Sequence, residues 1–375
     1  MALQTPYPVI SADSHITEHP DTYLAHIESA WKDKAPRVVD GGIKGDLFQI
    51  DGMERSIAMG LVAAAGKAPE EITTEGVKFE ELHRSGWDSS ARLADQNRDG
   101  IAAEVIYPTV GMVLCNHPDF DYKKACFDAY NRWIAEYCEF APNRLLGCGQ
   151  TAMRSPEEGV RDLQAIKALG LRGVMMPGEP AESDYDSEIY NPVWEAAIEL
   201  ELPLSFHILT GPSGGVRGPR LNSFLSIIRG NQDILGTLIF GGVFERYPQL
   251  KVVCVEADAG WVPHYMYRMD HAYKRHRNWL APGVELSRLP SEYFSEHIYT
   301  TFQDDWVAFR MANDMNWRRL MWANDFPHSD STWPWSMEML GEQTRQLSAE
   351  QTQAILCDNV AQLYQIDLDS LEVAA

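Results

Sequence analysis

Several side chains in this sequence are of the types that bind a divalent metal ion or move a proton, and each follows a short apolar stretch. They are Asp13 and His15 after residues 9–12, His207 after residues 202–206, Glu256 after residues 250–255, and Asp325 after residues 320–324. A short apolar run that stops at a polar side chain is typical of a buried parallel strand with that side chain at its carboxyl end. Imidazoles and carboxylates gathered at such ends would form a mixed nitrogen and oxygen site for a metal ion.

The pair Asp13 and His15 has the spacing that lets both side chains point the same way, because alternate residues of a strand share a face. The pair is equally compatible with polar residues that hydrogen-bond within a loop, but its place at the end of the first strand favours metal ligands. His207 could be a hydrogen-bonded core histidine. A glycine-rich loop follows it, which places His207 at the rim of a pocket and favours a ligand.

Glu256 and the residues after the last apolar stretch extend the candidate set. A buried glutamate is costly unless it is paired or bound to a metal, and Arg268 is an alternative salt-bridge partner. Asp325 could bind a metal and also take a proton from water bound to that metal. His328 could bind a second ion, act as an acid or base, or only form a hydrogen bond around Pro327. Glu256, Asp325 and His328 are therefore catalytic candidates as well as candidate ligands.

The elements that would hold these side chains alternate regularly along the chain. Eight strand-like runs are separated by helix-length segments, which predicts an α/β protein with parallel βα units closed as a (β/α)8 TIM barrel. In such a barrel the carboxyl ends of all strands face one pocket, so residues distant in sequence meet there. An open doubly wound sheet is the alternative, but no G-x-G-x-x-G follows the first strand. The predicted strands are residues 7–13, 103–108, 145–152, 173–176, 202–207, 250–256, 297–302 and 320–324.

The predicted helices carry their own start and stop signals. Ser155 as N-cap and Pro156 at the first helical position, followed by acidic residues, predict a helix that Gly170 ends. Ser348 starts a segment that resembles a capping box and predicts a helix to residue 364. The other predicted helices are one from residue 88 toward residue 101, residues 122–141, 192–200, one or two within 223–247, 261–279, 306–315 and 335–347.

Residues 18–90 do not follow this alternation. The segment contains proline, glycine and charged residues without a strong hydrophobic period, apart from a short strand predicted at residues 48–50. It is too long for a simple connection, so we expect an ordered, lid-like insertion beside the pocket. The chain from residue 1 to residue 375 is then expected to be a single barrel domain.

The composition limits the partners and the compartment. The formal net charge of −22 over 375 residues argues against nucleic acid and anionic membranes as partners. No apolar stretch approaches the roughly 20 residues of a membrane span, and the N-terminus lacks the basic and apolar regions of a signal peptide. The six cysteines form no C-x-x-C pair and are expected to be reduced thiols. We therefore expect a cytoplasmic protein.

Four further residues are candidates for binding a small-molecule substrate. Arg217 and Arg220 lie in a glycine-rich loop after the fifth strand and could hold a substrate carboxylate through paired hydrogen bonds, although solvated arginines are common in such loops. His117 follows the second strand and could line the pocket or lie on the surface. Trp261 could form a wall of the site or simply belong to the core.

These motifs together resemble the amidohydrolase superfamily, specifically the amidohydrolase-related branch with its aromatic decarboxylases and carbon–carbon hydrolases. The resemblance implies a barrel whose metal is bound by Asp13, His15, His207 and Asp325. It also implies an oligomer, formed with further copies of the chain or with a related barrel subunit. The resemblance spans nearly the whole chain and rests on residues 10–18, 100–108, 171–176, 204–207, 256–261 and 324–328.

The sequence departs from the family pattern at two positions of the site. Asp13 stands where many members have histidine, and Glu256 stands where decarboxylase-like members often have histidine. A glutamate cannot supply a neutral imidazole for proton transfer, but it can bind or bridge a metal. The ligand set contains no thiolate, so it suits one or two ions of Zn, Mn or Fe, and its excess of carboxylates favours Mn or Fe.

The sequence favours a metal-dependent enzyme that hydrolyses or decarboxylates a small organic acid or amide, with Asp325 as general base. If Glu256 and His328 both bind metal, the alternative is a dinuclear Fe or Mn monooxygenase, because a few amidohydrolase-related proteins resemble such hydroxylases. A third alternative is a catalytically silent barrel that serves as a scaffold or partner subunit.

Overall fold

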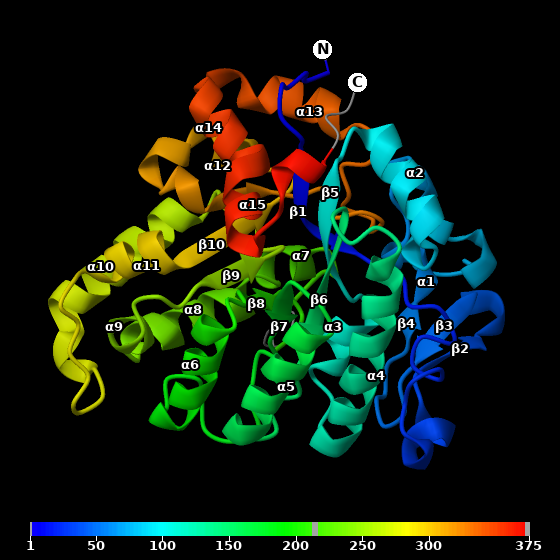
Figure 1. Cartoon of the computed structure of the whole chain (residues 1–375), viewed down its shortest axis with the longest axis horizontal. Helices are drawn as coiled ribbons and strands as arrows, with labels where there is room; N and C mark the ends of the chain where they lie inside the picture. The colour runs from blue at the N-terminus through cyan, green and yellow to red at the C-terminus, as the bar shows by residue number, and fades with distance from the viewer. Residues whose placement is uncertain (1, 212–216, 372–375) are drawn as a thin grey trace.

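Eight parallel strands form the central sheet and confirm the predicted (β/α)8 barrel. The computed structural model describes residues 2–211 and 217–371. Neighbouring strands follow the order β1-β5-β6-β7-β8-β9-β10-β11, and helices surround them (Figure 1). All eight predicted strands are present, as β1 Ile10–His15, β5 Ala103–Tyr107, β6 Leu145–Gln150, β7 Gly173–Met175, β8 Leu204–His207, β9 Val252–Val255, β10 Ile298–Phe302 and β11 Leu320–Trp322.

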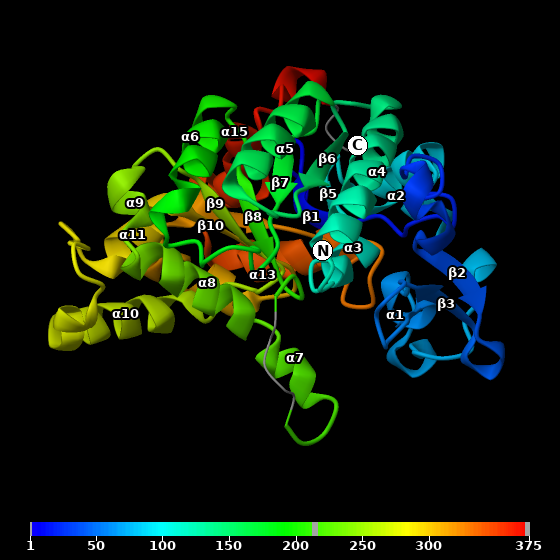
Figure 2. The same ribbon diagram turned by 90° about the horizontal axis from the view of Figure 1, so that it is seen from below.

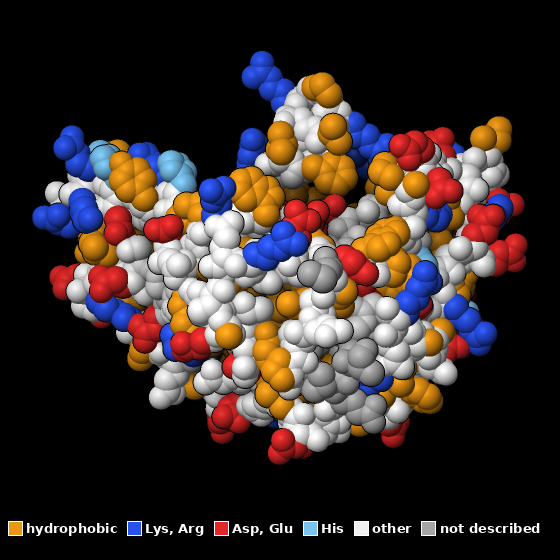
Figure 3. Space-filling model, turned by 90° about the horizontal axis from the view of Figure 1, so that it is seen from above, with side chains coloured by type: hydrophobic (Ala, Val, Ile, Leu, Met, Phe, Trp, Pro, Cys, Tyr) orange, Lys and Arg blue, Asp and Glu red, His pale blue; other side chains and the backbone are white. Residues whose placement is uncertain are grey.

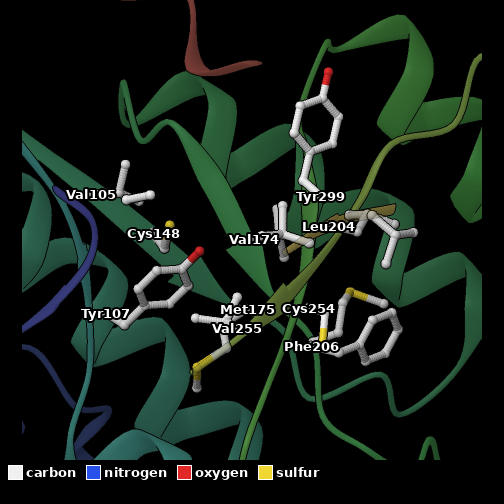
Figure 4. Close-up of a cluster of buried hydrophobic side chains, with 14 of the residues drawn as sticks. Val105, Tyr107, Cys148, Val174, Met175, Leu204, Phe206, Cys254, Val255 and Tyr299 are labelled. Atoms are coloured by element: carbon white, nitrogen blue, oxygen red, sulfur yellow. The ribbon is translucent and has the colours of Figure 1, made fainter. Parts of the chain in front are cut away.

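The strands are buried along their whole length, which explains why they are nearly continuous apolar runs. Figure 4 shows buried side chains that several neighbouring strands contribute to the core, among them Val105, Val174 and Leu204. The Tyr107 hydroxyl in this core has a partner, since it lies 2.9 Å from the Ser205 hydroxyl. All six cysteines are buried and unpaired, as expected for free thiols.

The barrel closes between β1 and β11, the two ends of the strand order. Within the described residues no strand ladder pairs β1 with β11. Two backbone hydrogen bonds connect them instead: the His15 N–H donates to the Phe326 carbonyl (2.7 Å), and the Asp325 N–H donates to the Asp13 carbonyl (3.1 Å). The candidate ligands Asp13, His15 and Asp325 therefore lie along this seam.

Most predicted helices are present. The helix α5 begins as predicted, because the Ser155 hydroxyl accepts a hydrogen bond from the Glu158 N–H, and Gly170 follows its end with a left-handed φ of 78°. None of the helices in the described ranges combines the length and apolar character of a membrane span. The longer helices are α2 Ser89–Asp99, α4 Phe120–Glu139, α5 Pro156–Ala168, α6 Asn191–Glu199, α8 Arg229–Phe240, α10 Val262–His276, α11 Pro290–His297 and α13 Ser336–Gln343.

The structure differs from the predicted helices at three places. The helix α11 was not predicted, and the helix expected at residues 306–315 is shorter, as α12, Trp306–Arg310. The capping box at Ser348 is present, but the helix it starts is interrupted by a π-helical turn between α14 and α15. The shorter helices are α1 Met59–Val62, α3 Val110–Leu114, α7 Asn222–Ser226, α9 Val243–Arg246, α12, α14 Ala349–Gln353 and α15 Asn359–Tyr364.

Residues 18–90 form an ordered excursion beside the barrel, on the right of Figure 1. Its three-stranded antiparallel sheet contains β2 (Arg37–Asp40), β3 (Asp46–Gln49) and β4 (Ile57–Ala58), so the strand predicted at residues 48–50 is present but begins and ends earlier. The segment contacts the chain just after β11: the Ala65 N–H donates to the Pro327 carbonyl (3.1 Å), and the Ser329 N–H donates to the Leu61 carbonyl (3.0 Å).

Candidate metal centre

Four parts of the barrel bring six candidate side chains together. Asp13 and His15 come from β1, His207 ends β8, Glu256 follows β9, and Asp325 and His328 follow β11. They form two overlapping groups, each with one ligand atom per residue and all such atoms within 4.8 Å of one another. The first group is Asp13, His15, His207 and Glu256, and the second is His15, Glu256, Asp325 and His328.

The Nε2 atom of His15 lies at the centre of this cluster. It is 3.2 Å from the His207 Nε2 atom and 3.2 Å from Glu256 Oε2. It is also 3.4 Å from one carboxylate oxygen of Asp13 and 3.4 Å from one of Asp325. Glu256 Oε2 is shared, because it also lies 3.1 Å from the His207 Nε2 atom. Glu256 thus contacts the two imidazoles, whereas Arg268 was the alternative partner considered from the sequence.

The orientation of the two imidazoles fits a bound cation. The Nδ1 atom of His15 lies 3.0 Å from the Pro108 carbonyl, and that of His207 lies 3.0 Å from the Ile208 carbonyl. A carbonyl only accepts, so each neutral imidazole carries its hydrogen on Nδ1 and directs the Nε2 lone pair into the cluster. Two lone pairs 3.2 Å apart cannot hydrogen-bond to each other, whereas a cation binds both.

The two aspartates support the same conclusion. Asp13 and Asp325 are fully buried; neither oxygen of Asp13 has a hydrogen-bond partner, and Asp325 faces only the imidazoles of His15 and His328. Unpartnered buried carboxylates are costly, and a divalent cation compensates for this cost. The residues present therefore fit a divalent metal ion.

The pKa values show how strongly the cluster requires positive charge. Burial lowers the pKa of His15, but Asp13 and Glu256 outweigh burial and raise it to about 9. Burial likewise lowers the pKa of His207, which Glu256 and Asp13 raise to about 10. Without a metal, protons on these imidazoles neutralise the carboxylates. A metal ion would take the place of those protons.

Asp325 and His328 form a second functional pair. The Nδ1 atom of His328 is 3.0 Å from one oxygen of Asp325, and its Nε2 atom is 2.9 Å from the Thr109 hydroxyl. That hydroxyl donates its single hydrogen to the Ile16 carbonyl (2.5 Å), so it accepts the hydrogen of His328 Nε2. The Nδ1 lone pair of His328 then faces the carboxyl group of Asp325, and a proton between them satisfies both.

Burial and neighbouring charges place that proton on Asp325. Burial and the charge of Glu256 raise the pKa of Asp325 well above its usual value. Burial and the charge of His15 lower the pKa of His328 well below its usual value. The imidazole of His328 also stacks on that of His15, with 3.9 Å between ring centroids. The pair can therefore hold a proton next to the metal cluster.

The backbone at the strand ends is strained. Glu256 and Asp325 adopt left-handed φ angles of 57° and 51°, and Asp258 has a φ of 54°. Residues other than glycine in this region cost free energy, and such residues gather at functional sites. The Glu256 N–H donates to the Thr301 hydroxyl (2.9 Å), which helps to hold the bend.

The structure does not bring the four candidate substrate-binding residues into the cluster. His117 is buried, and its Nε2 atom donates to the Asp51 carbonyl in the 18–90 segment (2.8 Å). Trp261 is half-buried, and its indole N–H donates to the Ala257 carbonyl (2.7 Å). Arg217 and Arg220 are exposed.

Sequence reasoning gave no role to Glu18, although it ends the motif of residues 10–18. Glu18 is fully buried and accepts hydrogen bonds from the N–H groups of Thr109, Val110 and Gly111. Burial raises the pKa of Glu18 to about 7. Its place at the end of that motif, three residues after His15, was the available signal in the sequence.

Comparisons with known proteins agree with this architecture. A family model described as Amidohydrolase matches residues 84–366. A 2-amino-3-carboxymuconate-6-semialdehyde decarboxylase from Dictyostelium discoideum is 25% identical over 270 residues, which cover 68% of this chain and 71% of the relative.

Two solved structures have the same fold at low sequence identity. An amidohydrolase from Mycobacterium avium subsp. paratuberculosis is 19% identical with a TM-score of 0.79, over 98% of this chain and 100% of that one. A 5-carboxyvanillate decarboxylase from Novosphingobium aromaticivorans is 19% identical with a TM-score of 0.71, over 97% of this chain and 99% of that one. The latter structure contains manganese and 3-methoxy-4-hydroxy-5-nitrobenzoic acid.

Proposed function

This chain belongs to the amidohydrolase family, and on that premise we propose that it is a metal-dependent decarboxylase of a small aromatic or similarly conjugated carboxylic acid. The observation that carries the proposal is the proton-holding pair of Asp325 and His328 beside unpartnered, metal-binding carboxylates. Two of the similar proteins described above are decarboxylases, and one was solved with manganese. The monooxygenase alternative gains no support from these relatives.

A divalent ion held by Asp13, His15, His207 and Asp325 would supply a Lewis acid that polarises the substrate oxygens. Decarboxylation breaks the bond between a carbon and its carboxylate, releases CO₂ and leaves an electron pair on that carbon. The carbon must then gain a proton. Asp325 would bind the ion as a carboxylate, and it lies 3.0 Å from His328 Nδ1, so the Asp325–His328 pair would hold and deliver that proton.

Glu256 serves this reaction through the cluster. Its Oε2 atom contacts the Nε2 atoms of both His15 and His207, so it adds negative charge where a metal would bind. The same charge raises the pKa of Asp325. Glu256 therefore favours a bound cation and, in the metal-free protein, favours a proton on Asp325.

The experiment is an anaerobic assay of the manganese-loaded protein in D₂O, with a panel of aromatic acids that includes 5-carboxyvanillate and 2,6-dihydroxybenzoate. The proposal predicts CO₂ release and one deuteron on the carbon that carried the carboxylate. Hydrolysis without CO₂ would reject decarboxylation. Stoichiometric metal without turnover of any substrate class would favour the silent scaffold.

We propose that residues 18–90 cover the site as a lid. The segment is hydrogen-bonded to the loop after β11 through Ala65 and Leu61. It is also held by His117, which follows α3. Gly52 allows this contact, since a Cβ atom at this position would lie 2.8 Å from the His117 Nε2 atom. The contacts come from two loops at the carboxyl side of the barrel strands, which is where a lid has to be anchored.

We also propose that the chain forms an oligomer with a second copy of itself through α7. This helix projects from the barrel in Figure 2 and forms the projection at the top of Figure 3, where hydrophobic side chains lie beside basic ones. Leu221 and Leu225 are 77% and 75% exposed. Residues 217–229 contain three arginines and no acidic residue, while the chain carries a net charge of −22. The projection is thus complementary in charge to the rest of another copy.

Sedimentation equilibrium tests this interface. The wild-type protein is expected to have at least twice the chain mass, and Leu225→Asp is expected to shift it to the monomer. The matched control is Ile43→Asp, a change at a 95% exposed residue of the 18–90 segment. A wild-type monomer at all concentrations would reject the oligomer.

A further inference from the structure

A buried arginine hydrogen-bonds to the backbone on both sides of the seam between β1 and β11. Arg92 lies in α2, outside the strands, and is fully buried. Its Nη1 atom donates to the His15 carbonyl (2.6 Å), and its Nη2 atom donates to the Phe326 carbonyl (3.2 Å). One planar guanidinium thus binds the backbone on both sides of the seam.

These two carbonyls belong to the candidate metal ligands or to their immediate neighbours. His15 is itself a candidate ligand, and Phe326 follows Asp325. The fork of a guanidinium fixes the separation and direction of the two groups that it binds, which a lysine ammonium cannot do. The guanidinium of Arg92 therefore fixes the backbone of His15 relative to that of Asp325.

A network of buried polar side chains fixes Arg92 in turn. Glu104 of β5 accepts from the Arg92 Nε atom (2.6 Å) and from Gln96 (2.8 Å). The amide nitrogen of Asn324 lies 3.4 Å from the other oxygen of Glu104. The Asn324 oxygen accepts from the hydroxyl groups of Ser11 and Ser14, at 3.0 and 2.8 Å. The network thereby connects α2, β1, β5 and the end of β11.

We infer that Arg92 is a positioning residue that sets the metal affinity of the site through its hydrogen bonds to the His15 and Phe326 carbonyls. The inference rests on the proposed metal centre, but it does not depend on the reaction that the centre performs. Side chains that orient metal ligands in this way typically change metal affinity by about 10- to 100-fold when they are removed. A purely structural arginine would change only the stability of the fold.

Two variants separate positioning from stability. Arg92→Lys keeps the charge opposite Glu104 but loses the fork. The double variant Arg92→Met/Glu104→Gln removes both charges, because a lone buried partner would destabilise the protein. The matched control is Lys124→Met/Asp162→Asn, which removes the charges of an ion pair between α4 and α5 (3.2 Å) that contacts no residue of the cluster.

The measurement is Mn²⁺ affinity by calorimetric titration, together with the electron paramagnetic resonance spectrum of the bound ion and the melting temperature. Both Arg92 variants are expected to stay folded, to bind Mn²⁺ about 10- to 100-fold more weakly and to show an altered spectrum, while the control keeps wild-type affinity. Wild-type affinity in a folded Arg92 variant would overturn the inference. A wild-type protein that binds Mn²⁺ without releasing CO₂ would reject only the proposed reaction.

Discussion

Glu256 illustrates how single side chains determine the chemistry of this centre. It occupies a position where the resemblance to decarboxylases suggests histidine, and its Oε2 atom contacts the Nε2 atoms of His15 and His207. The extra carboxylate increases the negative charge that a cation or protons must balance. The same charge contributes to the raised pKa values of both histidines and of Asp325.

Replacing Asp325 is expected to separate proton transfer from metal binding. Asp325→Asn keeps the size of the side chain but removes its proton-holding carboxyl, so turnover should fall by roughly 100-fold or more. Asp325→Ala should remove both activity and bound metal while the circular dichroism spectrum stays unchanged. Elemental analysis and the CO₂ assay measure the two effects, with Asp314→Asn at an exposed position as control. Full metal content in Asp325→Ala would contradict the assignment of Asp325 as a ligand.

Metal binding is expected to release protons. In the metal-free protein His15 and His207 have raised pKa values of about 9 and about 10, so both imidazoles are protonated at pH 7. A metal binds only the neutral ring and the ionised carboxylate, so Mn²⁺ should displace at least the two imidazole protons at pH 7, and its affinity should rise with pH until pH passes these pKa values. Calorimetric titration in buffers of different ionisation enthalpy counts the protons. An affinity independent of pH between 6 and about 9 would contradict this account.

At the scale of elements, the strands could be predicted because burial on both faces requires continuous apolar runs. The ends of those runs also identified the side chains that β1, β8, β9 and β11 bring together. The seam network could not be predicted in this way, because its contacts join residues as distant in sequence as Ser11 and Asn324. Arg92 does not follow an apolar run that would have identified it as a site residue. Its position in α2 also gives no indication in the sequence that it is buried.

Other features of the structure were also missed because they depend on short segments or on tertiary contacts. The helix α11 has only eight residues, among them two glutamates and two serines, so its apolar period is too short to stand out. The left-handed backbone at Glu256 and Asp325 results from tertiary contacts and leaves no mark in the residue types. His117 was a candidate for the pocket because it follows a strand, whereas the structure uses its ring to bind the 18–90 segment.

His117→Ala is expected to loosen that segment. The variant loses the hydrogen bond to the Asp51 carbonyl, so amide exchange around residues 50–53 should accelerate. Metal content should not change, because His117 is outside the cluster. If the segment is a lid, KM should rise by roughly the effect of one lost hydrogen bond, which is about 10-fold. Unchanged exchange and unchanged KM would contradict the lid.

At the scale of the whole molecule, the (β/α)8 fold explains why so few residues define the function. The barrel places residues as distant in sequence as Asp13 and His328 around one centre, because the six side chains of the cluster lie in, end or follow parallel strands. The 18–90 segment and the α7 projection are additions to this frame. They lie outside the eight-stranded sheet and contribute no residue to the cluster.

The most direct test of the account is the rate of anaerobic CO₂ release as Mn²⁺ is titrated into metal-free protein with an accepted aromatic acid. For a metal-dependent decarboxylase, the rate should rise in proportion to bound Mn²⁺, reach its maximum when the centre is filled, and need no oxygen. Turnover that persists without metal, or that requires oxygen, would contradict a metal-dependent decarboxylase.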